Sequence, residues 1–376
     1  MEHYLDNSAT TKVCPEAVQA ACEAMTELYG NPSSTHTKGR EAKKLLDRSR
    51  KTVSAALGCT PGELVFTSCG SESDNWAILS GAEAMKRKGK HVISSLVEHD
   101  AVRKSLDELE ARGFEVTRLR PEKDGSVAPE SVLAALREDT ALVTLMLVNN
   151  ETGGVTDIAG IARALRAAGS QALLHTDAVQ GFLKVPFSAR TLGADMISIS
   201  GHKIHAPKGV GALYIRSGLR LKPFILGGGQ EDGRRAGTEA LSQIAAFGEA
   251  CQIGKAGMTE NIARMRALRA QALEQLHREI PELRHIEAAA PHILSVSLPG
   301  WRSEVLMNFL EAREVYVSKS SACKKGGRSH VLEAIGLEAR TIDGAIRVGL
   351  SRYTTDGDID ALCQGLIDAR SSLRHA

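Results

Sequence analysis

The chain has 376 residues, which is long enough for two domains or for one large core with an appendage. Its composition, 43% hydrophobic and 24% charged, is that of an ordinary soluble globular protein. The 47 basic and 45 acidic residues nearly cancel, which argues against nucleic acid as the main partner, because nucleic-acid binders more often concentrate Lys and Arg on one face or in a tail.

The N-terminal residues 1–7 lack the basic region and the apolar region that together form a secretory signal. No run in the chain approaches the roughly 18 apolar residues that a membrane helix needs. We therefore expect a cytoplasmic protein with no membrane partner.

Short apolar runs that indicate buried strands alternate with amphipathic stretches over the first two-thirds of the chain. The predicted strands cover residues 63–69, 91–97, 141–149, 172–179, 195–201 and 209–216. Helical patterns lie between several of them, for example at residues 102–112 and 158–168, and a glycine follows each of these two. Strands that alternate with helices predict an α/β fold with a mostly parallel sheet covered on both faces.

The pattern changes near Leu241, where two long helical stretches begin. The second contains residues 261–279, is strongly amphipathic and is closed by Pro281. Alternating strands follow, with helices between them, at residues 293–298, 315–318 and 345–350. These elements predict a second, smaller α+β domain beyond a boundary near residue 255.

The first candidate for chemistry is Lys203, which comes after a predicted buried strand and a Ser-Gly-His turn. Burial penalises the charged form of a lysine and makes the free amine available as a nucleophile, so such a lysine can form a Schiff base with an aldehyde cofactor. An isolated lysine at the end of a strand is more often an ordinary surface residue. The neighbouring motifs favour the catalytic interpretation here.

Asp177 lies at the carboxyl end of another apolar run, where open α/β sheets bind ligands. Pyridoxal phosphate needs an acidic partner at its pyridinium nitrogen in order to act as an electron sink. Asp177 suits that role, and Gln180 can donate to the phenolic oxygen of the same cofactor. A single Asp at such a position is otherwise more often the cap of a turn.

A phosphate-binding turn is predicted after the strand at residues 63–69. Gly70 and Ser71 open a helical pattern there, and the backbone N–H groups of a helix N-terminus together with a hydroxyl can hold an anion. Ser200 and His202, on either side of the turn before the lysine, can complete this site. The signal is weak by itself because many α/β proteins turn in this way.

The seven cysteines are odd in number and contain no C-x-x-C pair, so neither a disulfide framework nor a metal site is expected. Cys323 differs from the others because small, polar and glycine residues surround it, which predicts an exposed loop. Lys324, Lys325 and Arg328 would favour its thiolate over its thiol. Cys323 is therefore the predicted nucleophile, while Cys69 is expected to serve in packing.

Together these motifs resemble those of the cysteine desulfurases, which belong to the class V aminotransferase group of pyridoxal-phosphate fold-type I enzymes. The resemblance runs nearly end to end. The matching blocks follow in the family's order, with YLDNSATT at 4–11, GNPSSTH at 30–36, VEHDAV at 97–102, VNNETG at 148–153, HTDAVQG at 175–181 and SGHKIHAPKGVGALY at 200–214. Several separate motifs in the correct order make a specific signal, whereas no single one would.

The resemblance implies a large cofactor-binding domain of residues 12–255, with a mostly parallel seven-stranded sheet flanked by helices. It implies a smaller α+β domain formed by residues 1–11 and 256–376. It also implies a homodimer, because Thr238, in a glycine-rich stretch, would reach the phosphate bound by the neighbouring subunit. A flexible surface loop is the alternative interpretation of that stretch.

The resemblance also assigns roles to single residues. Lys203 would hold the cofactor and then move the substrate α-proton, and His99 would stack on the cofactor ring and serve as a proton shuttle. Arg347 would bind the substrate carboxylate with Asn150 nearby, and Arg352 is the fallback for that role. The implied cofactor contacts are Gly70, Ser71, His99, Asn150, Asp177, Gln180, Ser200, His202, Lys203 and Thr238.

The family's sulfur-accepting cysteine corresponds to Cys323, ahead of the Ser-His-Val-Leu of residues 329–332. Two details depart from the family pattern. Ser320 stands where the family usually has glycine, and the segment from Cys323 to Ser329 is shorter and more basic. A shorter loop restricts how far Cys323 can travel toward an acceptor, so the acceptor stays open among proteins of iron–sulfur cluster biosynthesis, tRNA thiolation and cofactor synthesis.

The implied activity is that of a cysteine desulfurase, which removes sulfur from L-cysteine, releases L-alanine and leaves a persulfide on Cys323 for an acceptor protein. Two alternatives remain open. One is a selenocysteine lyase or another pyridoxal-phosphate C–S lyase on the same scaffold. The other is a non-catalytic adaptor of a sulfur system that kept the fold, and intact Lys203, Asp177 and Cys323 speak against it.

Overall fold

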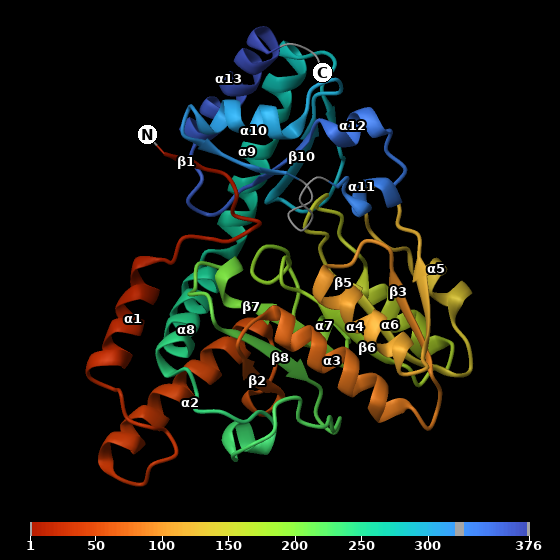
Figure 1. Cartoon of the computed structure of the whole chain (residues 1–376). Helices are drawn as coiled ribbons and strands as arrows, with labels where there is room; N and C mark the ends of the chain where they lie inside the picture. The colour runs from red at the N-terminus through yellow and green to blue at the C-terminus, as the bar shows by residue number, and fades with distance from the viewer. Residues whose placement is uncertain (1, 320–326, 374–376) are drawn as a thin grey trace.

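The computed structural model describes residues 2–319 and 327–373 of the chain. Figure 1 shows two parts, a larger one built on a wide sheet with helices around it and a smaller one above it that contains the C-terminal elements. The N-terminal strand β1 (His3–Tyr4) lies with the smaller part, where it pairs in parallel with β11 (Val315–Tyr316). Among the described residues, no helix is both long enough and apolar enough to cross a membrane.

The larger part contains a seven-stranded sheet. Its strands are β2 (Leu64–Thr67), β3 (His91–Ser95), β4 (Glu115–Leu119), β5 (Thr140–Met146), β6 (Leu173–Asp177), β7 (Met196–Ser200) and β8 (Gly211–Ile215). They lie in the order β2-β8-β7-β6-β5-β3-β4. The pairs from β7 to β4 are parallel, and β8 runs antiparallel to both of its neighbours. The predicted mostly parallel sheet is therefore confirmed.

The strand β4 has no counterpart among the strands predicted from the sequence. It lies at the edge of the sheet, and its first residue, Glu115, is exposed, whereas the central strands are buried along their whole length. An edge strand that is partly open to solvent needs no continuous apolar run. Its sequence EVTRL has none, so the pattern that marks the central strands is absent here.

Helices cover both faces of this sheet. They are α1 (Pro15–Thr26), α2 (Thr37–Leu57), α3 (Gly70–Met85), α4 (Asp100–Ala111), α5 (Pro129–Ala135), α6 (Ile158–Ala167), α7 (Ala189–Leu192) and α8 (Leu241–Ala256), with 3-10 turns η1 (Pro61–Glu63), η2 (Gly201–Lys203) and η3 (Gln230–Gly233). Successive strand residues face opposite sides: Leu142 belongs to the core cluster that contains residues of α3 and α4, whereas Val143 belongs to the one that contains residues of α1, α2, α6 and α8. Because both faces are covered, the central strands are apolar in unbroken runs.

The smaller part has an antiparallel four-stranded sheet in the order β12 (Ser318–Lys319), β13 (Ala345–Gly349), β10 (Ile293–Ser297) and β9 (Arg284–His285). Its helices are α9 (Met258–Glu279), α10 (Ser303–Glu311), α11 (His330–Ala334), α12 (Ala339–Asp343) and α13 (Asp356–Ser372). A separate hydrophobic core joins α9, α10 and α13 with Leu5 of the N-terminal segment. The division between residues 255 and 256 itself stays a prediction.

Candidate active site

A cavity of about 340 Å³ opens at the carboxyl ends of β5, β6 and β7, on the side that faces β13. Parallel α/β sheets bind ligands at this edge, and the volume is that of a small-molecule site. Ten of the twelve residues predicted for the site line it, namely Gly70, Ser71, His99, Asn150, Asp177, Gln180, Ser200, His202, Lys203 and Arg347. The structure thus brings them together, while their roles stay predictions.

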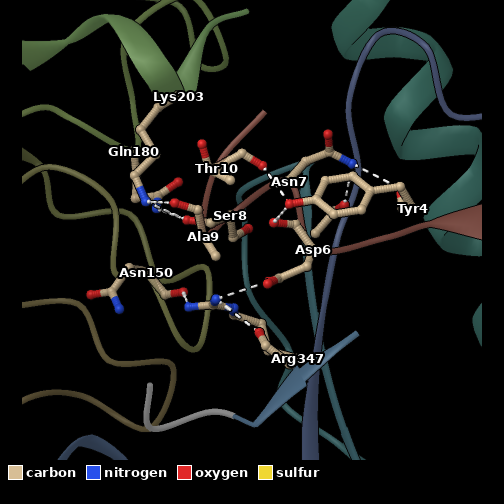
Figure 2. Close-up of polar contacts among 12 residues, drawn as sticks. Tyr4, Asp6, Asn7, Ser8, Ala9, Thr10, Asn150, Gln180, Lys203 and Arg347 are labelled. Carbon is tan, nitrogen blue, oxygen red and sulfur yellow. Dashed lines mark hydrogen bonds and ion pairs between the residues drawn. The ribbon is translucent and has the colours of Figure 1, made fainter. Parts of the chain in front are cut away.

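Lys203 ends η2, directly after β7, and lines the cavity. Figure 2 shows its Nζ beside the N-terminal segment, where it donates to the carbonyl oxygens of Ser8 at 2.6 Å and of Ala9 at 2.8 Å. Thr11 Oγ1 donates to the carbonyl oxygen of His202 at 2.9 Å, so the same segment also holds the turn that carries the lysine. The N-terminal segment therefore determines where the amine lies.

Asp177 ends β6, and only 7% of it is exposed. The Val179 N–H donates to its carboxylate at 2.9 Å. Burial raises the pKa of this carboxyl, while His99 and Lys203 act in the opposite direction. A buried carboxylate with positive neighbours suits an ion pair with the ring nitrogen of a cationic cofactor.

Gln180 and His99 already use part of their hydrogen-bonding capacity within the chain. Gln180 Nε2 donates to the Ser8 carbonyl oxygen at 2.8 Å, and its Oε1 accepts from Lys184 Nζ at 3.3 Å. His99 is exposed and precedes α4, where its Nδ1 accepts from the Ala101 N–H at 3.1 Å. In a neutral ring this bond places the proton on Nε2. His99 can therefore offer one N–H to a ligand in the cavity.

Two further carboxyl groups lie in the cavity wall, and the sequence did not single them out. Asp74, on α3, is 1% exposed and lies 3.6 Å from His175 Nε2. Glu98 is equally buried and accepts from Ser95 Oγ at 2.6 Å. Burial raises the pKa of Glu98 to about 8 and that of Asp74 well above its usual range. Asp177 differs from both, because His99 and Lys203 lower its pKa against the effect of burial.

The first turn of α3 is the predicted phosphate site, and the residues around it show whether the chain fits a phosphate there. A Cβ on Gly70 would stand 2.7 Å from Val179 Cγ2, so a side chain would fill this end of the cavity. Ser71, the next residue, is exposed and lines the cavity. Ser200 Oγ is buried and has no hydrogen-bond partner among the described residues. Burial lowers the pKa of His202 to about 4, so its ring is neutral. An unpartnered hydroxyl beside a helix N-terminus fits a phosphate.

Arg347 lies on β13 and is 2% exposed. Its Nη1 donates to the Asn150 carbonyl oxygen at 2.9 Å, and its Nη2 donates to Ser318 Oγ at 2.9 Å and Asp6 Oδ1 at 3.2 Å, as Figure 2 shows in part. Its Nε is buried without a partner in the described part of the chain. A guanidinium that is fixed at the cavity and keeps one unpartnered N–H donor is suited to bind a carboxylate. The fallback candidate Arg352 lines a different cavity.

Glu151 is a third buried acid that the sequence did not single out, although it lies inside the VNNETG block. Its Oε2 accepts from Ser329 Oγ at 2.5 Å, and Ser329 Oγ in turn accepts from the Leu332 N–H at the start of α11. Burial raises the pKa of Glu151 to about 7, against the influence of Arg347. Glu151 thus ties the larger part to α11 at the edge of the cavity. Its residue type alone gave no reason to select it.

Two predicted site residues are not in this cavity. Thr238 is exposed and does not line the cavity of its own chain, which is compatible with a contact to a neighbouring subunit. Cys323 lies outside the described residues. The described elements on either side of it adjoin the cavity, since Ser318 contacts Arg347 and His330 lines the cavity wall.

Comparisons with known proteins agree with this geometry. The sequence profile of the family described as Aminotransferase class-V matches residues 3–362. A cysteine desulfurase of Nostoc sp. is 40% identical over 376 residues, which cover 99% of this chain and 93% of that protein. The cysteine desulfurase IscS of Escherichia coli is 41% identical over 367 residues, with 95% and 90% covered. A solved structure described as a NifS-like protein has a TM-score of 0.94 at 35% identity and covers 99% of this chain and 100% of its own.

Proposed function

The chain belongs to the class-V aminotransferase family and is a cysteine desulfurase, and from this premise we propose that Lys203 binds its pyridoxal phosphate and that Cys323 receives the sulfur of L-cysteine. Enzymes of this family use pyridoxal phosphate. When bound, this cofactor supplies an electron sink that stabilises negative charge at the substrate α-carbon. The residues described above would bind the cofactor, move the protons, orient the substrate and receive the sulfur.

The residues that would hold the cofactor lie at one end of one sheet. Lys203 offers the amine, Asp177 offers a carboxylate to the ring nitrogen, and the first turn of α3 with Ser200 offers donors to the phosphate. The observation that carries this proposal is the buried Ser200 Oγ, which has no partner among the described residues. Ser200 lies beside the first residue of α3, since a Cβ on Gly70 would stand 3.4 Å from Ser200 Cβ. A buried hydroxyl is costly unless it is hydrogen-bonded, so the site calls for an acceptor such as a phosphate oxygen.

Lys203 takes the α-proton from the substrate and returns it. The carbonyl oxygens of Ser8 and Ala9 accept from its Nζ, so the ammonium that forms when it takes a proton finds acceptors already in position. His99, whose Nδ1 accepts from the Ala101 N–H, has its Nε2–H left to donate a proton to the substrate or product.

Arg347 orients L-cysteine by its carboxylate. Its guanidinium is buried and fixed by three acceptors, so it loses little side-chain freedom when the substrate binds. Arg347 and Lys203 line the same cavity, so a substrate held by its carboxylate at Arg347 would have its α-carbon placed relative to the Lys203 amine.

Cys323 attacks the sulfur of the bound substrate as a thiolate. A bond forms between the two sulfur atoms, the bond from the substrate sulfur to its β-carbon breaks, and the β-carbon gains a proton. The cysteine sulfur is oxidised and the substrate carbon is reduced, so L-alanine leaves, a persulfide stays on Cys323 and no external oxidant is consumed. The adjacent basic residues of the sequence favour the thiolate form. An acceptor protein then receives the outer sulfur.

We further propose that the enzyme acts in the cytoplasm as a homodimer in which Thr238 contacts the phosphate site of the neighbouring subunit. Thr238 is exposed and follows a glycine-rich stretch. Phe224, Ile225 and Leu226, just before that stretch, are 42%, 37% and 82% exposed. Three adjacent exposed apolar side chains are unusual on a free surface and suit a subunit interface.

The experiment is to incubate the purified protein with L-cysteine and a reductant and to measure alanine and sulfide. Wild type should release the two in equal amounts, and Cys323→Ala should release neither above background while it retains the cofactor. Equal sulfide from both proteins would refute the role of Cys323. No alanine from cofactor-loaded wild type would favour the adaptor, and turnover of L-selenocysteine but not of L-cysteine would favour a selenocysteine lyase.

A further inference from the structure

We propose that the protein binds a small inorganic anion, of the size of a halide ion, in a second cavity behind Lys203. This cavity measures about 30 Å³ and lies where α8 and α9 meet the turn after β6 and the end of β13. Lys203 lines both this cavity and the active site. A volume of this size holds one water molecule or one monatomic ion, and it excludes a phosphate or an organic acid.

Lys184 provides the first donor. It is 8% exposed, and among the described residues its Nζ donates one hydrogen bond, to Gln180 Oε1 at 3.3 Å. Burial lowers the pKa of Lys184 well below its usual range, and Lys203 and Arg347 act in the same direction. An ammonium group in such surroundings becomes favourable when a negative charge lies beside it.

Arg352 provides the second group that would bind the anion, and it gives the stronger reason to expect one. Its Nε and Nη2 are buried, and neither has a hydrogen-bond partner in the described part of the chain. Its guanidinium carbon lies 5.0 Å from the ring centroid of Tyr353, a contact that involves the face of the guanidinium rather than its N–H groups. A guanidinium stays charged in a protein, so its two buried N–H groups are costly unless an acceptor lies beside them.

The described lining of this cavity supplies no negative charge. The described residues that line the cavity include Asn261 and Ser351 but no Asp and no Glu. The chain treats another partly buried arginine differently: Arg50 donates to both carboxylate oxygens of Glu231, at 2.8 and 2.6 Å. Among the described residues, the buried Nε and Nη2 of Arg352 have no such partner beside Lys184, and a bound anion completes the site.

An anion in this position stabilises the folded protein, because it joins a residue of the larger part to a residue after β13 of the smaller part. A ligand that binds only the folded state raises the melting temperature in proportion to the logarithm of its concentration above Kd. The effect does not depend on catalysis or on the identity of the sulfur acceptor. It can therefore be measured whether or not the proposed function holds.

The test is the melting temperature of the full-length, cofactor-loaded protein at constant ionic strength while sodium gluconate is replaced by sodium chloride. Gluconate is too large for the cavity, so wild type should gain about 2–4 °C in chloride. Arg352→Met and Lys184→Met should lose this gain. Gly254→Ala should lose it with both cations intact, because its Cβ would stand 3.0 Å from Leu183 Cδ1 and 3.5 Å from Arg352 Nη1 and would reduce the cavity.

Arg48→Met is the control for weak binding of anions to the surface. Arg48 is exposed on α2, in a shallow surface depression that also contains Lys44, Lys51 and Lys255, so its variant should keep the chloride effect. In crystals soaked in bromide, an anomalous peak should lie within hydrogen-bond distance of Lys184 and Arg352. Equal melting temperatures of wild type in chloride and gluconate, an unchanged chloride effect in Arg352→Met, or a water molecule alone in the cavity would each overturn the proposal.

Discussion

The two walls of the active-site cavity are built in different ways. On the larger part, Asp177 and Ser200 end neighbouring strands of one sheet, and Lys203 follows directly. On the smaller part, Arg347 depends on acceptors from three other segments, namely the N-terminal segment, the loop after β5 and the strand β12. The first wall is a property of one sheet, whereas the second exists only when distant segments meet. Mutations in the two walls should therefore affect chemistry and substrate affinity separately.

Lys203→Ala should have the largest effect, because it removes the chemistry of the first wall. Lys203 is the only lysine among the described residues that line the cavity. We expect kcat to fall at least about 1,000-fold and the absorbance of the lysine-bound cofactor to disappear. Alanine formation and the visible spectrum measure the two effects. Lys208→Ala changes an exposed lysine nearby and should keep both. Lysine-bound absorbance in Lys203→Ala would show that another lysine carries the cofactor.

Arg347→Gln should affect the second wall and leave the first intact. The loss of a charged, buried donor to the substrate carboxylate should raise KM for L-cysteine about 100-fold. The cofactor spectrum should not change, since Asp177 and Lys203 lie on the other wall. Steady-state kinetics and the spectrum separate these outcomes, and Arg340→Gln, which changes an exposed arginine on α12, serves as the control. An unchanged KM would remove Arg347 from the substrate site.

Glu98→Gln tests the charge distribution of the first wall. Burial raises the pKa of Glu98 to about 8, while a Glu in an unfolded chain titrates near about 4.3. Between these values the folded state binds more protons, so this residue makes wild type lose stability as pH rises through the interval. Gln has no charge to bury, and the variant should gain about 2 kcal/mol relative to wild type between about pH 5 and about pH 8. Urea unfolding at a series of pH values measures the difference, and a constant difference would show that Glu98 does not titrate in this range.

Asp6→Asn should change KM for L-cysteine least among these variants, and it tests how the second wall positions Arg347. Asp6 Oδ1 lies 3.2 Å from Arg347 Nη2 and competes with a substrate carboxylate for the same cation. Asn keeps an oxygen acceptor but removes the charge, so KM for L-cysteine should fall about 2- to 5-fold. A rise in KM would show that Asp6 serves only to position Arg347.

Much of the first wall could be predicted from the sequence. The apolar run of β6 ends at Asp177, and that of β7 ends just before Lys203, and parallel strands bring their carboxyl ends to one edge. The turn at the start of α3 was predictable for the same reason, because Gly70 follows a strand and opens a helix. Local pattern and strand topology were sufficient here.

The contacts that distant segments make at the cavity could not be predicted in the same detail. Ser8 and Ala9 hold Lys203 through backbone carbonyl oxygens, which every residue has, so no side-chain pattern marks them. Asp6 meets Arg347 across 341 residues of sequence. The raised pKa of Asp74 depends on its burial on α3 beside His175 and Asp177 of β6, which only the packed structure reveals.

The intact mass of the protein after exposure to L-cysteine without reductant tests the proposed sulfur transfer most directly. Wild type should gain the mass of at least one sulfur atom, and peptide mapping should locate it on Cys323. Cys323→Ala should release no alanine above background and gain no sulfur, although it binds the cofactor through Lys203 as before. The same mass gain in Cys323→Ala, or sulfur located on another cysteine such as Cys69, would contradict the role of Cys323.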